Sequence, residues 1–363
     1  MNAADSQWMA RALHLAERGL WTTSPNPRVG CVLVRDGKAV GEGWHERAGE
    51  PHAEVHALRA AGSAARGATA YVTLEPCSHH GRTPPCADAL VSARVNRVVV
   101  ATQDPNPLVA GQGVARLRAA GIDVECGVME AAARELNIGF FSRMTRGTPW
   151  VRSKIAASLD GRTALANGSS KWITGEYARH DVQRWRARSC AMLTGIGTVL
   201  ADDPRLNVRE PAAQRQPLRV VVDSGLRISP RARIVQDGPI LVFTACTDAD
   251  KQQSLSACGA EVVTVADAGG KVDLAGMMRD LGRRGINEVL VEAGRTLNGG
   301  LIKARLVDEL VLYLAPQFLG DAARGMADIG ELAQLDRHIA LQWGDVRQVG
   351  NDLRIVAKIS RES

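Results

Sequence analysis

The stretch that decides the fold of the first half is His52-Ala53-Glu54, which is followed along the chain by Pro76-Cys77 and Pro85-Cys86. One imidazole and two thiolates hold Zn²⁺ through three protein ligands and leave the fourth tetrahedral position open for water. We therefore predict that His52, Cys77 and Cys86 are zinc ligands. Glu54, two residues after the histidine, is the predicted catalytic acid–base. Centres of this composition remove an amino group from a nucleobase-type ring.

The segments around the ligands predict two helix N-termini beside the metal, where helix dipoles favour anionic thiolates. Helical runs follow Pro51 and Pro84-Pro85, which is where prolines usually stand at a helix entrance. The long spacing between Cys77 and Cys86 departs from the usual Pro-Cys-x-x-Cys. It argues against a generic cytidine or tRNA-adenosine deaminase and indicates a specialised pocket wall. We interpret His56 as a packing residue or a partner of a ligand, because the zincin pattern places its glutamate directly after the first histidine.

Length and composition bound the class of protein. A chain of 363 residues is long enough for two domains, and 45% hydrophobic with 23% charged residues is typical of a soluble globular enzyme. The N-terminus lacks a signal segment and no apolar run approaches the ~20 residues that cross a bilayer, so no membrane association is expected. The seven cysteines are scattered along the chain, which fits the reducing cytoplasm better than a framework of disulfides. The net charge of +6 is not concentrated in a basic block, which favours small anionic ligands over nucleic acid.

Strand and helix signals alternate along both halves of the chain, which predicts two separate α/β domains, 1–147 and 148–363. A polar, turn-rich stretch at 143–149 is the predicted linker. The predicted strands are 29–34, 70–74, 95–101, 122–126, 151–157, 191–194, 219–222, 240–244, 261–265, 288–292, 309–315 and 353–359. The predicted helices are 7–18, 52–61, 86–93, 111–120, 130–140, 175–187, 249–257, 273–284 and 295–304.

The second half lacks a Gly-x-Gly-x-x-Gly after its first strand, so a Rossmann fingerprint is absent. Val291–Gly300 is a strand that leads into glycines and a helix, and a helix N-terminus of this kind can hold a diphosphate. Thr194–Thr198 is a second small-residue turn after a strand, and it precedes Asp202-Asp203. Each turn alone could be a plain tight turn. Together they favour a cofactor cleft.

The whole chain resembles the bifunctional riboflavin-biosynthesis pyrimidine deaminase/reductase family, of the RibD type. The stretches that carry the resemblance are Pro25–Gly30, Gly49–Glu54, Thr73–His79, Gly81–Cys86, Asp104–Pro107, Ser158–Gly161, Thr198–Pro204 and Val291–Gly294. The family has the long loop between the cysteines. The resemblance implies a cytidine-deaminase-like α/β/α sandwich followed by a dihydrofolate-reductase-like α/β domain.

The resemblance also implies the chemistry and the partners. The implied substrate is 2,5-diamino-6-ribosylamino-4(3H)-pyrimidinone 5′-phosphate, which would lose its 2-amino group at a zinc site and then have its ribosyl group reduced by NADPH. A homodimer or homotetramer built through the reductase domain is expected. The preference for NADPH over NADH comes from the resemblance alone, since no local arginine pattern indicates binding of the 2′-phosphate.

Further site residues are expected from the same family positions. Those that would bind the substrate of the first domain are Asn26, His45, His79 and Arg82. Those that would bind NADPH are Ala156, Trp172, Thr198, Asp202, Ser224, Gly294, Arg295, Thr296, Leu297, Asn298, Gly299 and Gly300. Those that would bind the sugar phosphate are Ser170, Arg186, Leu206, Arg209 and Glu292. The ionisable groups expected near the reacting carbon are Lys154, Asp202 and Glu292, although Lys154 could be an ordinary strand lysine and Asp202 a turn cap.

Two other classes of protein compete with this interpretation. A nucleic-acid deaminase with an accessory domain predicts a basic groove with stacking aromatics, yet aromatic residues make up only 4% of the chain. A structural zinc protein predicts four protein ligands, and the sequence offers no fourth. Cys31 lies among apolar strand residues and is expected in the core. Stabilisation of the protein by NADPH would favour the bifunctional enzyme over both alternatives.

Overall fold

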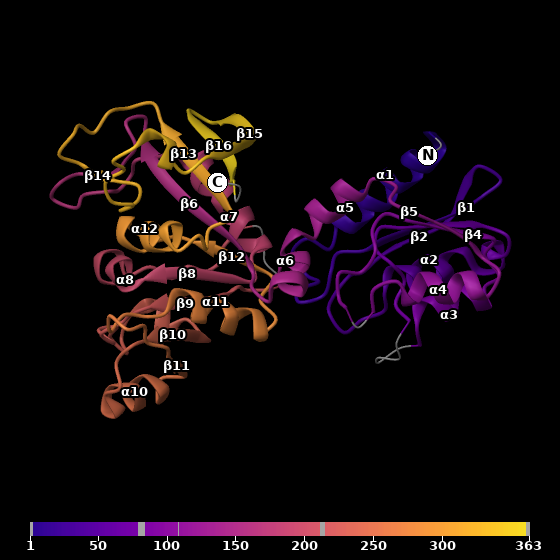
Figure 1. Cartoon of the computed structure of the whole chain (residues 1–363), viewed down its shortest axis with the longest axis horizontal. Helices are drawn as coiled ribbons and strands as arrows, with labels where there is room; N and C mark the ends of the chain where they lie inside the picture. The colour runs from indigo at the N-terminus through magenta and orange to yellow at the C-terminus, as the bar shows by residue number, and fades with distance from the viewer. Residues whose placement is uncertain (1–2, 79–83, 108, 211–214, 361–363) are drawn as a thin grey trace. The chain divides into compact units, whose positions relative to one another are not determined.

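Each half of the chain has its own sheet and its own core. The structure is a computed structural model that describes residues 3–78, 84–107, 109–210 and 215–360. It divides into the units Met1–Gly147 and Thr148–Ser363 (Figure 1).

The sheet of the first unit has five strands in the order β2-β1-β3-β4-β5. Its strands are β1 (Gly30–Arg35), β2 (Lys38–Trp44), β3 (Thr69–Val72), β4 (Arg97–Val100) and β5 (Asp123–Cys126). Strand β1 runs antiparallel to β2 and β3, whereas β3, β4 and β5 are parallel. The helices of this unit are α1 (Ala3–Glu17), α2 (Ala53–Ala61), the short η1 (Gly62–Ala65), α3 (Cys86–Ser92), α4 (Gln112–Ala119), α5 (Glu130–Leu136) and α6 (Ile138–Arg146).

Helices cover both faces of this sheet, because successive strand residues point to opposite sides. Cys31 and Leu33 of β1 face a cluster that includes side chains of α2, α3 and α4. Val32 and Val34 face the opposite cluster, which includes side chains of α1 and α5. The unit is therefore a three-layer α/β/α sandwich.

Two glycines of β2 set how closely helix α2 lies on the sheet. A Cβ added at Gly41 would lie 2.2 Å from the Ala57 carbonyl oxygen, and one added at Gly43 would lie 2.5 Å from the Ala53 carbonyl oxygen. Only glycine permits this approach. The first turn of α2, which follows His52, is thereby held against the sheet.

The sheet of the second unit has nine strands in the order β11-β10-β9-β8-β12-β6-β13-β16-β15. Its strands are β6 (Trp150–Ser158), β8 (Ala191–Gly195), β9 (Leu218–Val222), β10 (Ile240–Thr244), β11 (Ala260–Thr264), β12 (Glu288–Val291), β13 (Glu309–Ala315), β15 (Leu341–Val349) and β16 (Asp352–Ile359). The strands from β11 to β13 are parallel, and β16 and β15 extend the sheet with antiparallel pairings. Strands β7 (Arg162–Ala164) and β14 (Arg324–Gly325) form a separate pair.

Helices also cover both faces of the second sheet. They are α7 (Glu176–Arg188), α8 (Ile196–Asp202), α9 (Arg233–Gln236), α10 (Ala249–Ser256), α11 (Leu274–Arg283), α12 (Arg295–Lys303) and the short η2 (Leu335–Arg337). Side chains of α11 and α12 pack on one face of the parallel strands, and side chains of α8, α9 and α10 pack on the other. Helix α7 packs on β13 through Ala178 and Val182.

The strands predicted from the sequence are present, and so are the helices, with bounds shifted by a few residues and with one exception. The predicted helix 130–140 is wrong as a single helix, because the backbone leaves the helical conformation at Asn137 and divides it into α5 and α6. The predicted turn at Thr194–Thr198 is also wrong, because β8 continues to Gly195 and α8 begins at Ile196. Strand β2 was not predicted because Gly41 and Gly43 occupy its buried positions in place of apolar side chains. Strand β15 was not predicted because its side chains are mostly exposed, so no apolar alternation marks it. The predicted linker 143–149 is partly wrong: helix α6 continues to Arg146 and ends at Gly147, whose φ of 72° closes the helix. Basic residues in the last turn of α6 favour the longer helix, because they interact with its C-terminal dipole.

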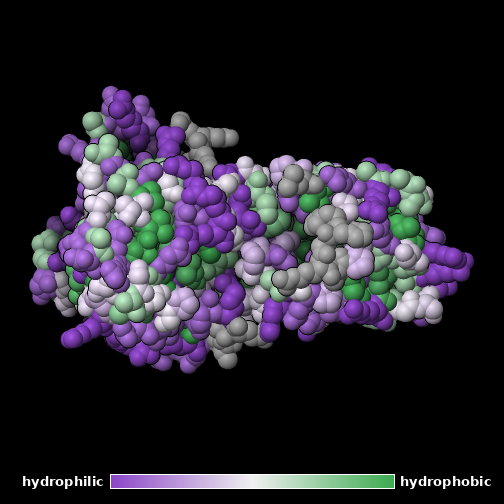
Figure 2. Space-filling view, turned by 90° about the horizontal axis from the view of Figure 1, so that it is seen from below, coloured by the Kyte–Doolittle hydropathy of each residue, from purple (hydrophilic) through white to green (hydrophobic). Residues whose placement is uncertain are grey.

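The face seen in Figure 2 is mostly hydrophilic, and its hydrophobic residues form separate small patches on each unit. Among the helices of the described ranges, none is both long enough and apolar enough to pass through a bilayer.

Candidate active sites

The predicted metal ligands of the first unit lie together. His52 Nδ1 is 3.6 Å from Cys77 Sγ and 3.3 Å from Cys86 Sγ. A tetrahedral zinc with bonds of about 2.0–2.1 Å to nitrogen and about 2.3 Å to sulfur sets these atoms about 3.5 Å apart. The three side chains therefore form a donor set of the size that zinc requires. Within the described ranges, the group has no fourth His, Cys, Asp or Glu member, which leaves a coordination position for water.

Three backbone elements position these ligands. His52 is the N-cap of α2, and Cys86 is the first residue of α3. Cys77 follows β3, and its sulfur accepts a hydrogen bond of 3.3 Å from the Cys86 backbone amide. The Ala87 amide donates to the Cys77 carbonyl oxygen at 3.1 Å. The two helix N-termini that the sequence predicts at this site are present.

A buried glutamate orders the loop that carries Cys77. Glu75 is 4% exposed, and its carboxylate accepts hydrogen bonds from the backbone amides of Asp104, Gly111 and Val114. This residue was not identified from the sequence, although a glutamate at the end of a buried strand is an unusual feature that could have singled it out.

Glu54 lies in the first turn of α2, next to the ligands, and is 3% exposed. Its Oε2 atom has no hydrogen-bond partner in the part of the chain that the structure describes. Burial raises the pKa of Glu54 to about 7. A buried carboxyl oxygen without a partner, beside a metal donor set, fits a group that exchanges a proton with a metal-activated water.

The pKa values of the two thiols are shifted in opposite directions. Hydrogen bonds from the Cys86 side chain, from His52 and from the Cys86 backbone amide lower the pKa of the Cys77 thiol to about 4. The interaction with Cys77 raises the pKa of the Cys86 thiol in turn. At least one sulfur is thus a thiolate at neutral pH and ready to bind a cation.

A second pair of predicted residues lies beside His52. Asn26 Nδ2 is 3.1 Å from His45 Nε2, and His45 Nδ1 is 3.1 Å from the Pro51 carbonyl oxygen. Because a carbonyl oxygen only accepts, His45 Nδ1 carries a hydrogen. His45 is 2% exposed, and its ring meets the His52 ring edge-on with centroids 5.3 Å apart. The predicted substrate residues His79 and Arg82 lie outside the described residues.

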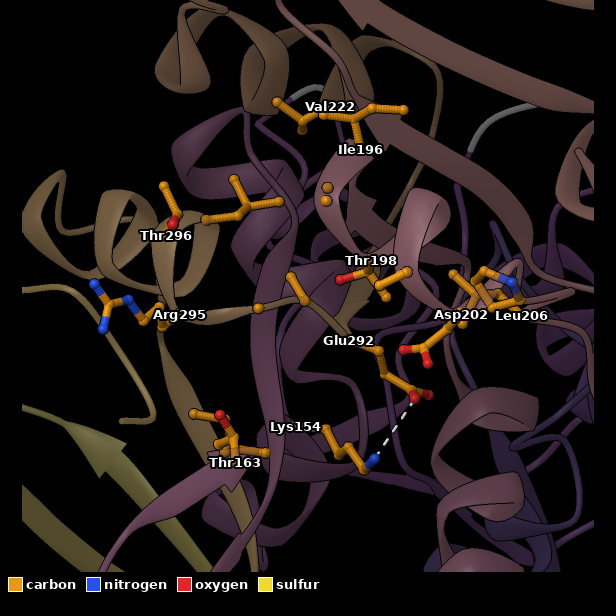
Figure 3. Close-up of a pocket in the computed structure, with 18 of the residues that line it drawn as sticks. Lys154, Thr163, Ile196, Thr198, Asp202, Leu206, Val222, Glu292, Arg295 and Thr296 are labelled. Atoms are coloured by element: carbon orange, nitrogen blue, oxygen red, sulfur yellow. Dashed lines mark ion pairs between the residues drawn. The ribbon is translucent and has the colours of Figure 1, made fainter. Parts of the chain in front are cut away.

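The second unit holds a cleft of about 1970 Å³ at the carboxyl ends of its parallel strands, the usual place for ligands in such a sheet. Single small-molecule sites occupy about 300–1,000 Å³, so this cleft has room for a dinucleotide and a substrate together. Figure 3 shows Lys154, Thr198, Asp202 and Glu292 around the cleft, with Thr296 on another wall.

Lys154 and Glu292 meet because β12 and β6 pair in parallel register. Val291 lies opposite Ser153, which places the next residue of each strand side by side. Lys154 Nζ is 3.5 Å from Glu292 Oε2 (dashed line in Figure 3). Arg186, in the last turn of α7, donates to both oxygens of Glu292 at 2.6 and 2.9 Å. Burial would raise the pKa of Glu292, but the charges of Arg186 and Lys154 outweigh it and bring the pKa to about 2.

The predicted Asp202 lines the same cleft and makes its ion pair with Lys171, at 3.2 Å. Trp172, which was expected to contact the cofactor, is 70% exposed at the rim, with the Arg179 guanidinium 4.7 Å above its ring. The other predicted residues of this unit that line the cleft are Ala156, Ser170, Arg186, Thr198, Leu206, Arg209, Ser224, Glu292, Gly294, Arg295, Thr296, Leu297 and Gly300.

Two predicted cofactor residues do not line the cleft. Asn298 is 1% exposed, accepts a hydrogen bond from Ser153 Oγ at 3.2 Å and donates to the Ala293 carbonyl oxygen at 3.1 Å. A Cβ at Gly299 would lie 2.4 Å from the Asp328 carbonyl oxygen. Asn298 and Gly299 therefore act on the structure of the turn.

The cleft fits a dinucleotide in one further respect. A Cβ added at Gly197, in the first turn of α8, or at Gly294, before α12, would meet no atom within 4 Å, so a ligand can approach the backbone at the start of both helices. Gly294 is the N-cap of α12, whose first amide groups can donate to a diphosphate.

Several basic residues of the cleft were not predicted, among them Arg205, Arg227 and Lys271. Arg227 could have been found from its place shortly after a parallel strand, whereas no local signal marks Lys271.

Comparisons with known proteins agree with the predictions made for both halves of the chain. The model of the cytidine and deoxycytidylate deaminase zinc-binding region matches residues 2–102, and that of the RibD C-terminal domain matches residues 149–355. These matches define the class: a bifunctional enzyme with a zinc-dependent, cytidine-deaminase-like domain and an NADPH-dependent reductase domain. Its cofactors are Zn²⁺ and NADPH. The predicted fold class, cofactors and type of activity are confirmed.

The full-length relatives place the chain within this class. It is 52% identical to riboflavin biosynthesis protein RibD of Escherichia coli (strain K12), over 96% of this chain and 98% of the relative. The solved structure of Acinetobacter baumannii RibD (form 1) has a TM-score of 0.92 and 46% identity over 99% of both chains. A diaminohydroxyphosphoribosylaminopyrimidine deaminase/5-amino-6-(5-phosphoribosylamino)uracil reductase from Thermotoga maritima has a TM-score of 0.88 and 33% identity, over 98% of this chain and 99% of that one. The chain belongs to the RibD family of riboflavin biosynthesis proteins.

Proposed function

We propose that unit 1–147 deaminates 2,5-diamino-6-ribosylamino-4(3H)-pyrimidinone 5′-phosphate and that unit 148–363 then reduces the ribosyl group to ribityl. The product is 5-amino-6-ribitylaminouracil 5′-phosphate. The observation that carries this proposal is the triangle of His52, Cys77 and Cys86. Its two nitrogen–sulfur distances match those of a tetrahedral zinc site, and it lies beside a buried carboxyl group. The Thermotoga relative is named for a deaminase and a reductase activity of the same kind.

In the deamination, water and the ring C–NH₂ group give a carbonyl and ammonia. Zinc held by His52, Cys77 and Cys86 would supply an activated water. Glu54 takes the proton of the water, passes it to the ring nitrogen and then protonates the departing amine. Its elevated pKa suits a group that must both accept and donate a proton near neutral pH. Asn26 and His45 orient the ring, and the family resemblance implies that His79 and Arg82 also bind the substrate.

In the reduction, the bond between C1′ and the ribose ring oxygen is replaced by a C1′–H bond, and the ring oxygen takes a proton. NADPH supplies the hydride. We assign the proton to Lys154, which Glu292 holds at 3.5 Å. Glu292 stays ionised and fixes both Lys154 and Arg186. Asp202 lines the same cleft and is assigned to the cofactor.

The remaining cleft residues are assigned to the two ligands. Gly294 and the turn that follows it would hold the NADPH diphosphate at the N-terminus of α12. The guanidinium groups of Arg186 and Arg209 suit the phosphate of the sugar, because they offer paired donors. The NADPH residues are Ala156, Trp172, Thr198, Asp202, Ser224, Arg295, Thr296, Leu297 and Gly300, and the substrate residues are Ser170, Leu206 and Glu292.

One assay tests both steps. The full chain is given the diaminopyrimidinone phosphate with and without NADPH, and ammonia and NADPH absorbance are followed separately. We expect ammonia release without NADPH, and NADPH oxidation only after deamination. Absence of ammonia from zinc-loaded protein would reject the deaminase assignment, and unchanged NADPH oxidation by Lys154→Ala would remove Lys154 from the second site.

We further propose that the protein is a cytoplasmic homo-oligomer built through the second unit. Strand β15 forms an edge of the nine-stranded sheet, and it exposes Trp343 (65%) and Val346 (53%). An exposed edge strand with apolar side chains is suited to pairing with a second copy. Light scattering of the full chain and of Trp343→Glu, which should dissociate, tests this. A cytoplasmic location is consistent with the need for NADPH.

A further inference from the structure

Helix α4 packs against the loop that follows β3. A Cβ added at Gly113, in the first turn of the helix, would lie only 2.0 Å from the Pro76 carbonyl oxygen. The Glu75 carboxylate accepts the amides of Gly111 and Val114 at 2.9 and 3.1 Å. The helix is thus in contact with the two residues that directly precede the first zinc thiol.

The charge of Glu75 suits its place at the start of α4. Gly111 is the N-cap of this helix and has no side chain that could accept a hydrogen bond from the first amides. A carboxylate at a helix N-terminus is stabilised by those amides and by the helix dipole. Glu75 therefore supplies the missing cap, and in doing so it joins α4 to the loop after β3.

Arg116, in the middle of α4, joins both of the segments that carry the cysteines. Its Nη1 donates to the Ser78 carbonyl oxygen at 3.0 Å, and its Nε lies 2.6 Å from Asp88 Oδ1. Ser78 directly follows Cys77, and Asp88 lies in the first turn of α3, which begins at Cys86. One planar side chain therefore spans the two segments that supply the thiolates.

Helices α3 and α4 also lie side by side and share a core (Figure 1). The buried cluster on this face of the sheet includes Ala87 and Leu90 of α3 and Val114 and Leu117 of α4. Because such a core is close-packed, α3 cannot move along α4 without opening it. The place of Cys86, at the start of α3, is consequently fixed relative to α4.

Zinc requires a set distance between the two sulfurs. Bonds of about 2.3 Å in a tetrahedron place them about 3.8 Å apart, and metal–ligand distances tolerate about 0.2 Å. Two hydrogen bonds join the segments directly, from the Cys86 amide to Cys77 Sγ and from the Ala87 amide to the Cys77 carbonyl oxygen. Helix α4 adds a common support, because it holds residues on both sides of Cys77 and the first turn of α3.

We propose that α4 sets the separation of the two zinc thiolates, and that Glu75 and Arg116 are the positioning residues through which it acts. The proposal rests on the zinc-dependent deaminase function of the first unit. The described donor set consists of His52, Cys77 and Cys86 and includes neither positioning residue. Each of the two therefore acts on the metal through the backbone that it holds.

The test uses the full chain and compares Arg116→Ala with Arg118→Ala. Arg118 is the matched control, because it is an exposed arginine of the same helix and donates to the Val124 carbonyl oxygen of β5 at 3.0 Å. Zinc affinity is measured by competition with a chelator. The visible absorption spectrum of the Co²⁺-substituted protein reports the geometry of the ligands, and the melting temperature reports stability.

We expect Arg116→Ala to weaken zinc binding by roughly tenfold, as removal of groups that orient metal ligands does, and to change the Co²⁺ spectrum. In the zinc-loaded variant, kcat for ammonia release should fall while KM changes less than about twofold. Arg118→Ala should lower the melting temperature to a similar degree and keep the zinc affinity and the spectrum of the parent.

Two further variants separate positioning from a general loss of stability. Asp88→Ala should weaken zinc binding in the same way, and its effect should not add to that of Arg116→Ala, because the two substitutions remove one contact. Glu75→Gln keeps the size of the side chain but removes its charge and one acceptor oxygen, so it should also lower zinc affinity.

Parent-like zinc affinity and Co²⁺ spectra in both Arg116→Ala and Glu75→Gln would overturn the proposal. An equal loss of zinc in Arg118→Ala would do the same, as would additive effects of Arg116→Ala and Asp88→Ala. A parent chain that binds no zinc would instead refute the zinc site itself.

Discussion

Replacement of Gly43 by alanine is expected to disable the deaminase while sparing the reductase. The added Cβ would lie 2.5 Å from the Ala53 carbonyl oxygen and 2.6 Å from the Ala57 amide nitrogen. Ordinary contact begins at 3.4 Å, so helix α2 must retreat by about 0.9 Å. Overpacking of this kind costs about 1–3 kcal/mol.

The displaced helix carries His52 and Glu54. Metal–ligand distances tolerate about 0.2 Å, so a shift of about 0.9 Å should weaken zinc binding. A misplacement of about 1 Å also lowers catalysis by about 100-fold. We expect Gly43→Ala to contain less zinc per chain and to release ammonia about 100-fold more slowly, with NADPH oxidation of the deaminated intermediate unchanged.

The control is Gly37→Ala, at the hairpin between β1 and β2. Gly37 has a φ of 70° and open space around its Cβ position, so alanine there strains only the backbone, by about 1–2 kcal/mol. This variant should be destabilised to a similar degree and keep its zinc and its ammonia release. If the zinc content and ammonia release of Gly43→Ala equal those of Gly37→Ala, the close approach of β2 and α2 does not position the site.

Three further predictions concern the two sites. Glu54→Gln should slow ammonia release by about 10²–10⁴-fold with zinc still bound, and near-normal release from the zinc-loaded variant would remove Glu54 from the mechanism. The lowering of the pKa of Glu292 from 4.5 to about 2 corresponds to at most about 3 kcal/mol of stability. This contribution is complete above pH 4.5 and disappears as the pH falls toward 2, because protonation then removes the partner of Arg186 and Lys154. Urea unfolding followed by tryptophan fluorescence should accordingly show a flatter acid profile for Glu292→Gln than for the parent, and parallel profiles would contradict the assignment. Removal of zinc by a chelator should lower the melting temperature of the first unit and leave NADPH oxidation of the deaminated intermediate intact; loss of both activities would show that the metal supports the whole chain.

The chemistry of the first site could be predicted from local sequence. His52, Glu54, Cys77 and Cys86 have residue types that zinc chemistry requires, and the strand and helix signals around them are strong. What the sequence did not reveal is how these segments are held together. Glu75 orders the Cys77 loop through amides at 104, 111 and 114, and no local pattern predicts such long-range contacts.

The second site shows more clearly the difference between what the local sequence predicted and what only the structure revealed. The small residues around Gly197 and Gly294 were recognisable after predicted strands, and in the structure they lie at the starts of α8 and α12. The family resemblance supplied most of the cleft residues. Asn298 and Gly299 belong to the same motif, yet the structure turns them into the protein. A helix presents successive residues to different sides, so a contiguous motif cannot all face one ligand.

The amino-acid sequence by itself determined the donor types, the alternation of strands and helices and the family, because these depend on residue chemistry and on periodicity within a few residues. Only the tertiary structure decided that Lys154 lies beside Glu292 and that the loops of Arg227 and Lys271 adjoin. Both contacts depend on the lateral order of strands, with β12 inserted between β8 and β6, and on loops that meet at the carboxyl ends of the parallel strands. That order is set by the packing of the whole sheet against its helices, and contacts between residues that lie so far apart in the sequence leave no trace in the local pattern.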